Sequence, residues 1–155
     1  MSFFNTTRLH LCNGAVLSLM CLACTGLKAQ VAEGNDIVVV VKRGIALAPL
    51  TTDQVARIFL GLSDTLPNGG AVIPVDAPES SVLYQDFYSK VLGKSAAQIK
   101  AYRARQSFTG AGIAPRQVES LSQALKQKLT GHTVMTYTLR RALDDQWSIV
   151  LETGK

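Results

Sequence analysis

The sequence predicts a single α/β domain in which a mixed, mostly parallel sheet is flanked by helices. Three observations lead to this fold class. Residues 37–41 form a continuous run of β-branched residues, which is typical of a strand covered on both faces. Short apolar runs alternate along the chain with amphipathic helical segments. The 126 residues that follow position 29 are enough to form one hydrophobic core.

Residues 1–29 carry the ordered features of an export signal. Arg8 precedes an apolar run over residues 11–27, the segment contains no Asp or Glu, and a small residue stands at Ala29. We expect cleavage after Ala29, a periplasmic location and no membrane insertion after cleavage. Two alternatives stay open, namely a retained membrane anchor and lipid attachment at Cys24. The domain itself is predicted to span residues 30–155.

The composition of residues 30–155 excludes several classes of protein. All three cysteines lie within residues 1–29, so the domain contains neither a disulfide nor a cysteine-ligated metal. Without Arg8 and Lys28, the 16 Lys and Arg residues fall to 14, against 11 Asp and Glu, for a net charge of +3. This mild charge does not indicate a nucleic-acid partner. We expect no cofactor and no metal.

Capping signals and apolar spacing predict the individual elements. Thr51 and Gln54 form a capping box at the start of one helix, and Ser95 and Gln98 form another. A strand is expected over residues 71–75, with its pairing ended by Pro74. The remaining expected elements are helices from Ser80 or Ser81 to Leu92, from Ser95 to about Gln106 and over Ser120–Leu129, a glycine-rich loop over Ser107–Pro115, strands over Thr133–Tyr137 and Trp147–Leu151, and a helical turn within Leu139–Asp145.

The first candidate binding loop joins a strand to a helix. Ligands of open α/β sheets bind beyond the carboxyl ends of the strands, and residues 76–81 occupy such a position. A helix start presents unpaired N–H groups, so Asp76, Ser80 and Ser81 are candidate ligand-binding residues for an oxyanion. The alternative is that Ser80 and Glu79 only cap the helix and interact with its dipole. Asp76 and Glu79 would repel an anion unless a basic residue offset their charge.

The second candidate loop is glycine-rich. Thr109, Gly110 and Gly112 would allow the backbone to approach a ligand closely, or equally would form a surface turn. Elsewhere, His132 is interpreted as a turn residue. The basic pairs Lys42–Arg43 and Arg103/Arg105 could face an anion or an acidic partner, but each is interpreted as a solvated face. No G-x-S-x-G motif is present, so the sequence gives catalysis the least support, and no catalytic residue is assigned.

Several segments of the chain also resemble a known protein family. Residues 50–61 fit the pattern L-T-x-x-Q-x-x-x-I-F-L-G, and residues 73–76 and 108–112 extend the match. In these segments the chain resembles phosphate-type periplasmic solute-binding proteins. Members that bind phosphate between two lobes are about twice as long, so the resemblance implies one three-layer lobe of that fold. Those proteins have an Arg-Ser-Asp-x-Ser-Gly-Thr-like loop after the matching strand. In this chain only Ser80 corresponds to a residue of that loop, and its arginine is missing.

Two functions from different classes follow. The first is non-covalent binding of phosphate or another small oxyanion, linked to ABC-type phosphate transport through a transporter partner. The second is an envelope protein-interaction module that has kept the fold and lost the ligand. An enzyme that uses Ser80 is the third and weakest hypothesis.

Overall fold

A computed structural model describes residues 36–110, 112, 114–126 and 131–153 of the chain. The predicted export signal, its Cys24 alternative and the predicted end of the fourth helix at Leu129 lie outside these residues. Within the described ranges, none of the helices has the length and apolar character that crossing a membrane requires.

The centre of the domain is a five-stranded sheet in the order β3-β2-β4-β1-β5. Its strands are β1 (Ile37–Lys42), β2 (Ala71–Asp76), β3 (Arg116–Gln117), β4 (His132–Leu139) and β5 (Trp147–Glu152). β2 runs parallel to both β3 and β4, whereas β1 runs antiparallel to both β4 and β5. Four strands therefore share one direction and β1 opposes them, which confirms the expected mixed sheet. Because β1 pairs with two of these strands, two of the four pairings are antiparallel, so the sheet is not mostly parallel as expected.

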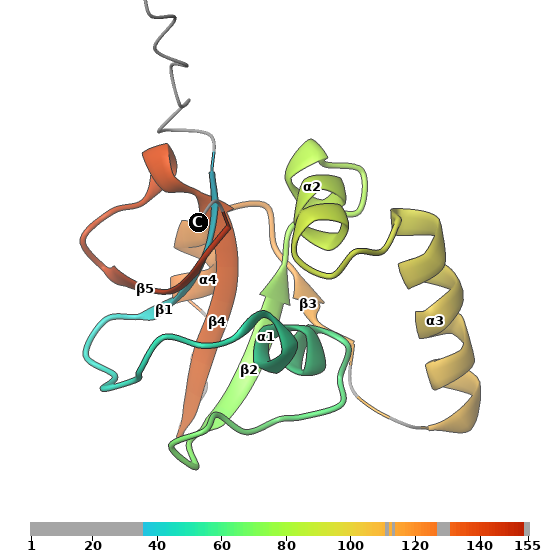
Figure 1. Ribbon diagram of the computed structural model, residues 1–155, viewed down its shortest axis with the longest axis horizontal. Coiled ribbons are helices and arrows are strands. Elements are labelled where there is room, and N and C mark those ends of the chain that lie inside the picture. Colours follow the sequence, from blue (N-terminus) through green and yellow to red (C-terminus); the bar gives the residue numbers. More distant parts are fainter. Residues whose placement is uncertain (1–35, 111, 113, 127–130, 154–155) are drawn as a thin grey trace, which may run out of the picture.

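Helices cover both faces of this sheet (Figure 1). They are α1 (Thr52–Phe59), α2 (Val82–Lys90), α3 (Ala96–Thr109) and α4 (Leu121–Leu125), and a 3₁₀ turn, η1, spans Arg140–Ala142. α1 and α2 contribute to one core cluster, and α4 contributes to the other. The domain thus has three layers, as the family resemblance implied.

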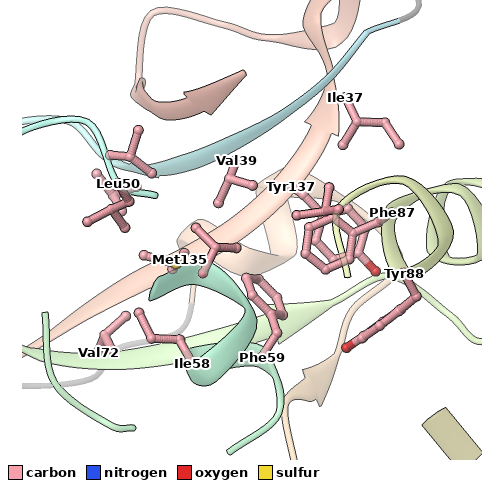
Figure 2. Packing of buried hydrophobic residues seen from close by; sticks show 14 of the residues in the cluster. Ile37, Val39, Leu50, Ile58, Phe59, Val72, Phe87, Tyr88, Met135 and Tyr137 are labelled. Atoms are coloured by element: carbon pink, nitrogen blue, oxygen red, sulfur yellow. The ribbon is translucent and has the colours of Figure 1, made fainter. Parts of the chain in front are cut away.

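The alternation of β1 divides the core between the two faces. Ile37, Val39 and Val41 pack with α1 and α2, and Val38 and Val40 pack against the α4 side. All five are buried, which confirms that the β-branched run is a strand covered on both faces. Phe87 lies within the larger cluster (Figure 2). Its ring stacks on that of Tyr137 with 3.7 Å between the ring centroids, and it packs edge-on against Phe59 with 4.8 Å between the centroids.

Two expected boundaries were wrong. The third helix does not end near Gln106 but continues to Thr109, so part of the predicted loop over residues 107–115 is helical. His132 is the first residue of β4 rather than a turn residue. β3 was not predicted, because a strand of two exposed residues carries no apolar pattern.

Pro74 does not end the pairing of β2, which continues to Asp76, with Pro74 opposite Met135 in β4. The reason is the direction in which the backbone groups point. The N–H of Val72 donates to Asp64 O, away from β4, and alternate residues of a strand face the same side. Pro74 therefore also faces away from β4, and its missing N–H costs that ladder nothing.

Candidate ligand-binding site

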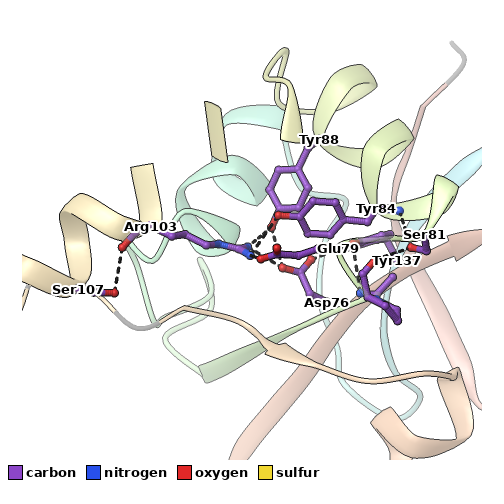
Figure 3. Close-up of polar contacts among 10 residues, drawn as sticks. Asp76, Glu79, Ser81, Tyr84, Tyr88, Arg103, Ser107 and Tyr137 are labelled. Atoms are coloured by element: carbon purple, nitrogen blue, oxygen red, sulfur yellow. Dashed lines mark hydrogen bonds and ion pairs between the residues drawn. The ribbon is translucent and has the colours of Figure 1, made fainter. Parts of the chain in front are cut away.

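The carboxyl end of β2 is held by a buried polar network around Asp76 (Figure 3). One carboxylate oxygen accepts hydrogen bonds from Arg103 at 2.6 Å and from Tyr88 at 2.9 Å. The other accepts from the Tyr137 hydroxyl at 2.8 Å. Asp76 is fully buried and the Arg103 side chain is 14 % exposed. The acceptor sites of Asp76 are thus largely occupied by its own fold.

Arg103 connects this network to the neighbouring loop. It donates to the Tyr84 hydroxyl at 3.2 Å and lies 3.8 Å from the Glu79 carboxylate. Its guanidinium also lies over the rings of Tyr84 and Tyr88. The interpretation of Arg103 as part of a solvated face was therefore wrong. Arg103 provides the positive charge that offsets Asp76 and Glu79.

Burial dominates the protonation of these groups. It raises the pKa of Asp76, although the charge and hydrogen bond of Arg103 and the two tyrosine hydroxyls favour the ionised form. Burial raises the pKa of Tyr84 to about 12, and it raises those of Tyr88 and Tyr137 as well, with Asp76 adding to all three shifts. The folded state thus retains three tyrosine protons more strongly than the unfolded chain does.

We predict alkaline unfolding driven by these tyrosines. Below their ordinary pKa of 10.0 both states keep the protons, and above it only the unfolded state releases them readily. The free energy of unfolding should therefore fall as pH rises above 10. Circular dichroism and tyrosinate absorbance, recorded on the same samples, should change together. Tyrosinate formation by Tyr84, Tyr88 and Tyr137 near pH 10 with the fold intact would contradict the prediction.

The loop after Asp76 places the two predicted serines differently. Ser81 is the N-cap of α2, where its hydroxyl accepts from Tyr84 N at 3.1 Å and donates to Pro78 O at 2.7 Å. Capping therefore accounts for Ser81, whereas the capping alternative named Ser80 and Glu79. Ser80 is exposed at the same helix start. Ligand binding by either residue stays a prediction.

A cavity of about 350 Å³ lies beside this loop, after the carboxyl end of β2 and against the last part of β4. We call it the strand-end pocket. Its polar side chains come from the chain before α4 and the first turn of α4, from β4 and from the segment after η1, and include Glu119, Ser120, Ser122, Thr136, Thr138 and Asp144. Ala77 and Leu83 connect it to the loop that carries Ser80 and Ser81.

The hydroxyl groups of this pocket are only partly used by the fold. Thr136 donates to Val75 O at 2.9 Å. Ser120 and Ser122 lie 2.9 Å apart, so one of them donates to the other and the pair keeps one O–H for a ligand. Thr138 is 5 % exposed, and no hydrogen bond joins its hydroxyl to any residue that the structure describes. Among the described residues, Trp147 Nε1 is the only side-chain polar atom that is both buried and without a hydrogen-bond partner. The Thr138 hydroxyl therefore reaches the open space of the pocket, where it can donate to a ligand or a water.

The second predicted loop lies near the amino ends of β2 and β4, at the opposite end of the strands from the Asp76 loop. Thr109 ends α3, and its hydroxyl donates to Arg105 O and Gln106 O. Gly110 caps the helix with a φ of +66°. Gly112 lines a different cavity, which includes Ala71 and His132 at the starts of β2 and β4. The structure therefore does not bring Thr109, Gly110 and Gly112 together with Asp76, Ser80 and Ser81 in one site.

Gly112 has a structural role that substitution can test. Its φ is +87°, and a Cβ there would lie 2.8 Å from both Gly61 O and Gln106 Nε2. Gly112→Ala should lower the free energy of unfolding by about 2 kcal/mol, because alanine is strained at this positive φ and its Cβ would clash with Gly61 O and Gln106 Nε2. Gly110→Ala is the control, since its φ of +66° has open space around it and only the backbone cost of about 1 kcal/mol applies. Equal urea-unfolding midpoints for the two variants would refute the assignment.

The residues that sequence reasoning missed are those brought close by the topology. Thr138 and Ser120 lie in unrelated segments, and neither belongs to a recognisable motif. The available signal was the position of two threonines, Thr136 and Thr138, on the apolar face of a strand. Among the described residues, no group of three His, Cys, Asp or Glu side chains is placed to hold a metal ion.

Known proteins match the chain through its fold rather than through its sequence. No family model matches the chain, and the comparison with curated proteins gives no match. An ABC-type phosphate transport receptor from Vibrio cholerae superposes with a TM-score of 0.56 at 16 % sequence identity, over 76 % of this chain and 47 % of the receptor.

A second solved structure is of a protein from Clostridium perfringens that is described as a putative phosphate ABC transporter substrate-binding protein, with bound phosphate. It gives a TM-score of 0.55 at 16 % identity, over 76 % of this chain and 45 % of that chain. This chain therefore spans about half the length of the proteins it matches. At this identity the likeness concerns the fold, and in its fold the chain is similar to part of the phosphate transport receptors, as the resemblance in the sequence implied.

Proposed function

We propose that the chain is an exported, non-enzymatic domain that binds phosphate or a similar small oxyanion in the strand-end pocket. The observation that carries this proposal is the Thr138 hydroxyl, which lines the pocket without a hydrogen-bond partner among the described residues. The similarity of the fold to phosphate receptors supports the choice of ligand. A periplasmic location and a link to an ABC-type transporter belong to the same proposal.

In this proposal the ligand is recognised by hydroxyl groups. Thr138 and the Ser120–Ser122 pair donate to its oxygens from the pocket. Ser80 does not line the pocket but is exposed in the adjoining loop, from which its hydroxyl would reach the ligand. Ser81 acts indirectly, because its hydroxyl holds the helix start in place. Arg103 lowers the electrostatic cost of an anion near this loop by offsetting Asp76 and Glu79.

The charge of the pocket restricts the form of the ligand. Glu119 and Asp144 line it, and its described lining contains no Lys, Arg or His. Carboxylates accept hydrogen bonds but repel a fully ionised anion, so a protonated oxyanion fits better than one without a proton. Hydrogen phosphate should therefore bind more tightly than sulfate, and binding should strengthen as pH falls.

Isothermal titration of the protein with phosphate, sulfate and small carboxylates tests the proposal. We expect heat with phosphate, and Thr138→Val should reduce the affinity about tenfold, because this change removes the hydroxyl and keeps the shape of the side chain. Ser89→Ala, an exposed serine at the far end of α2, is the matched control and should bind like the parent. The absence of heat at millimolar phosphate would sink the proposal.

A second function, in a different class, is favoured by exposed apolar side chains. Phe108 is 93 % exposed and Val82 is 73 % exposed, which is unusual for large apolar residues in a small domain. Such residues suit an envelope protein-interaction module. That function predicts crosslinking to a specific envelope protein without added anion, which Phe108→Ser should abolish. Equal crosslinking yield for the parent and Phe108→Ser would argue against it.

A further inference from the structure

A second and larger cavity, of about 520 Å³, opens near the amino ends of β2 and β4, at the opposite end of these strands from the strand-end pocket. We call it the amino-end hollow, because Ala71 and His132, the first residues of β2 and β4, both line it. It exists because β3 is short. β3 pairs only with Val75 and Asp76, so among the described residues no strand covers the outer edge of β2 over residues 72–74.

The walls of the amino-end hollow are apolar. Ile58 and Val72 line it from the main core and are each only 2 % exposed, whereas Ile73 and Pro74 of β2 line it and are partly exposed. Leu62, which follows α1, is 55 % exposed and also lines the hollow. Apolar surface that the fold leaves open to water in a concave site favours an apolar part of a ligand.

A small number of polar side chains complete the lining. Arg116 enters from β3 and His132 from β4, and Asp64 is the single carboxylate of the described lining. A guanidinium has five N–H donors in a fork that matches a carboxylate, so it can bind a ligand in addition to a partner within the fold. The hollow thus combines an anion-binding side chain with apolar walls.

The backbone of β2 contributes no donor at this edge. The Val72 N–H donates to Asp64 O at 2.8 Å, and Pro74 has no N–H. An extended peptide needs such groups to add a strand to a sheet, so pairing of that kind is blocked here. Recognition must come from the side chains.

We propose that the amino-end hollow binds a small carboxylate with an apolar tail. The carboxylate pairs with Arg116, and the tail packs on Leu62, Ile73 and Pro74, the apolar side chains of the lining that the fold leaves partly exposed. This site is separate from the strand-end pocket, with which it shares no described lining residue. Its existence does not depend on phosphate binding in the strand-end pocket.

Titration of hexanoate into the full chain, followed by methyl NMR, tests this proposal. We expect saturable shifts of the Leu62, Ile58 and Ile73 methyl groups. Arg116→Gln should weaken hexanoate binding about tenfold, since it removes a charged hydrogen-bond donor. Arg105→Gln is the matched control, because Arg105 is exposed on α3 and does not line the hollow. Hexan-1-ol, with the same tail and no charge, should bind about tenfold more weakly than hexanoate, for the same reason.

Two further measurements keep the test decisive. Leu62→Asp places a carboxylate at the mouth of the hollow at a half-exposed position, and it should abolish hexanoate binding even if Arg116→Gln fails to fold. Saturating phosphate should leave hexanoate binding unchanged. The proposal is overturned if hexanoate causes no saturable shift at these methyl groups, if Arg116→Gln binds like Arg105→Gln, or if phosphate displaces hexanoate.

Discussion

Replacing Arg103 with leucine is expected to destabilise the domain by about 3–5 kcal/mol, the range for breaking one partner of a buried ion pair. The change leaves the Asp76 carboxylate buried with two tyrosine hydroxyls and without a counter-charge. It also releases α3, which carries Ile99 as its only buried apolar residue and is attached mainly by polar contacts. Urea unfolding followed by circular dichroism measures the effect.

Arg105→Leu is the control for this prediction, because Arg105 lies on the same helix and is exposed. Its effect should stay within about 0.5 kcal/mol. Arg103→Lys should fall between the two, since lysine keeps the charge and loses the planar fork. Adding Asp76→Asn to Arg103→Leu should recover part of the loss, because the uncompensated charge is then removed. Equal stabilities of the Arg103→Leu and Arg105→Leu proteins would show that the network does not stabilise the fold.

Truncation of Phe87 to alanine is expected to cost about 3–5 kcal/mol as well. Phe87 is fully buried and packs against the rings of Phe59 and Tyr137, which also contact each other, so its removal leaves a cavity where α1, α2 and the sheet meet. The stacking on Tyr137 also positions one hydroxyl that donates to Asp76. The free energy of unfolding in urea is again the measurement.

Phe108→Ala provides a matched control, since it makes the same chemical change at a side chain that is 93 % exposed. It should alter stability by less than about 0.5 kcal/mol. Phe87→Leu should cost about 1–2 kcal/mol, because leucine fills most of the space and loses only the ring contacts. A Phe87→Ala protein as stable as Phe108→Ala would contradict the described core.

The elements that the sequence predicted correctly depend on local signals. The capping boxes at Thr51 and Ser95 are both present, each with its glutamine bonded back to the cap. The β-branched run of β1 is covered on both faces, as its composition indicated. Such features follow from residues within four positions of each other, which single-sequence reasoning can evaluate.

The features that escaped prediction depend on the topology. Arg103 and Asp76 are 27 residues apart, and nothing in the local sequence of Arg103 distinguishes it from the exposed Arg105. Both candidate loops were expected at the carboxyl ends of the strands. Because α3 extends to Thr109, the second loop lies instead near the amino ends of β2 and β4. The strand-end pocket combines the residue after β2, the start of α2, the start of α4 with the chain before it, β4 and the end of η1, an arrangement that no local motif describes.

The composition of the β2 edge also affects how copies of the protein meet. An unpaired strand edge usually acts as a template on which identical chains add, layer upon layer. Here Pro74 has no N–H and the Val72 N–H is already bonded, so this edge offers no backbone donor at these positions to an incoming strand. The outermost strand, β3, has only two residues. Concentrated protein should consequently resist fibril formation from this side of the molecule.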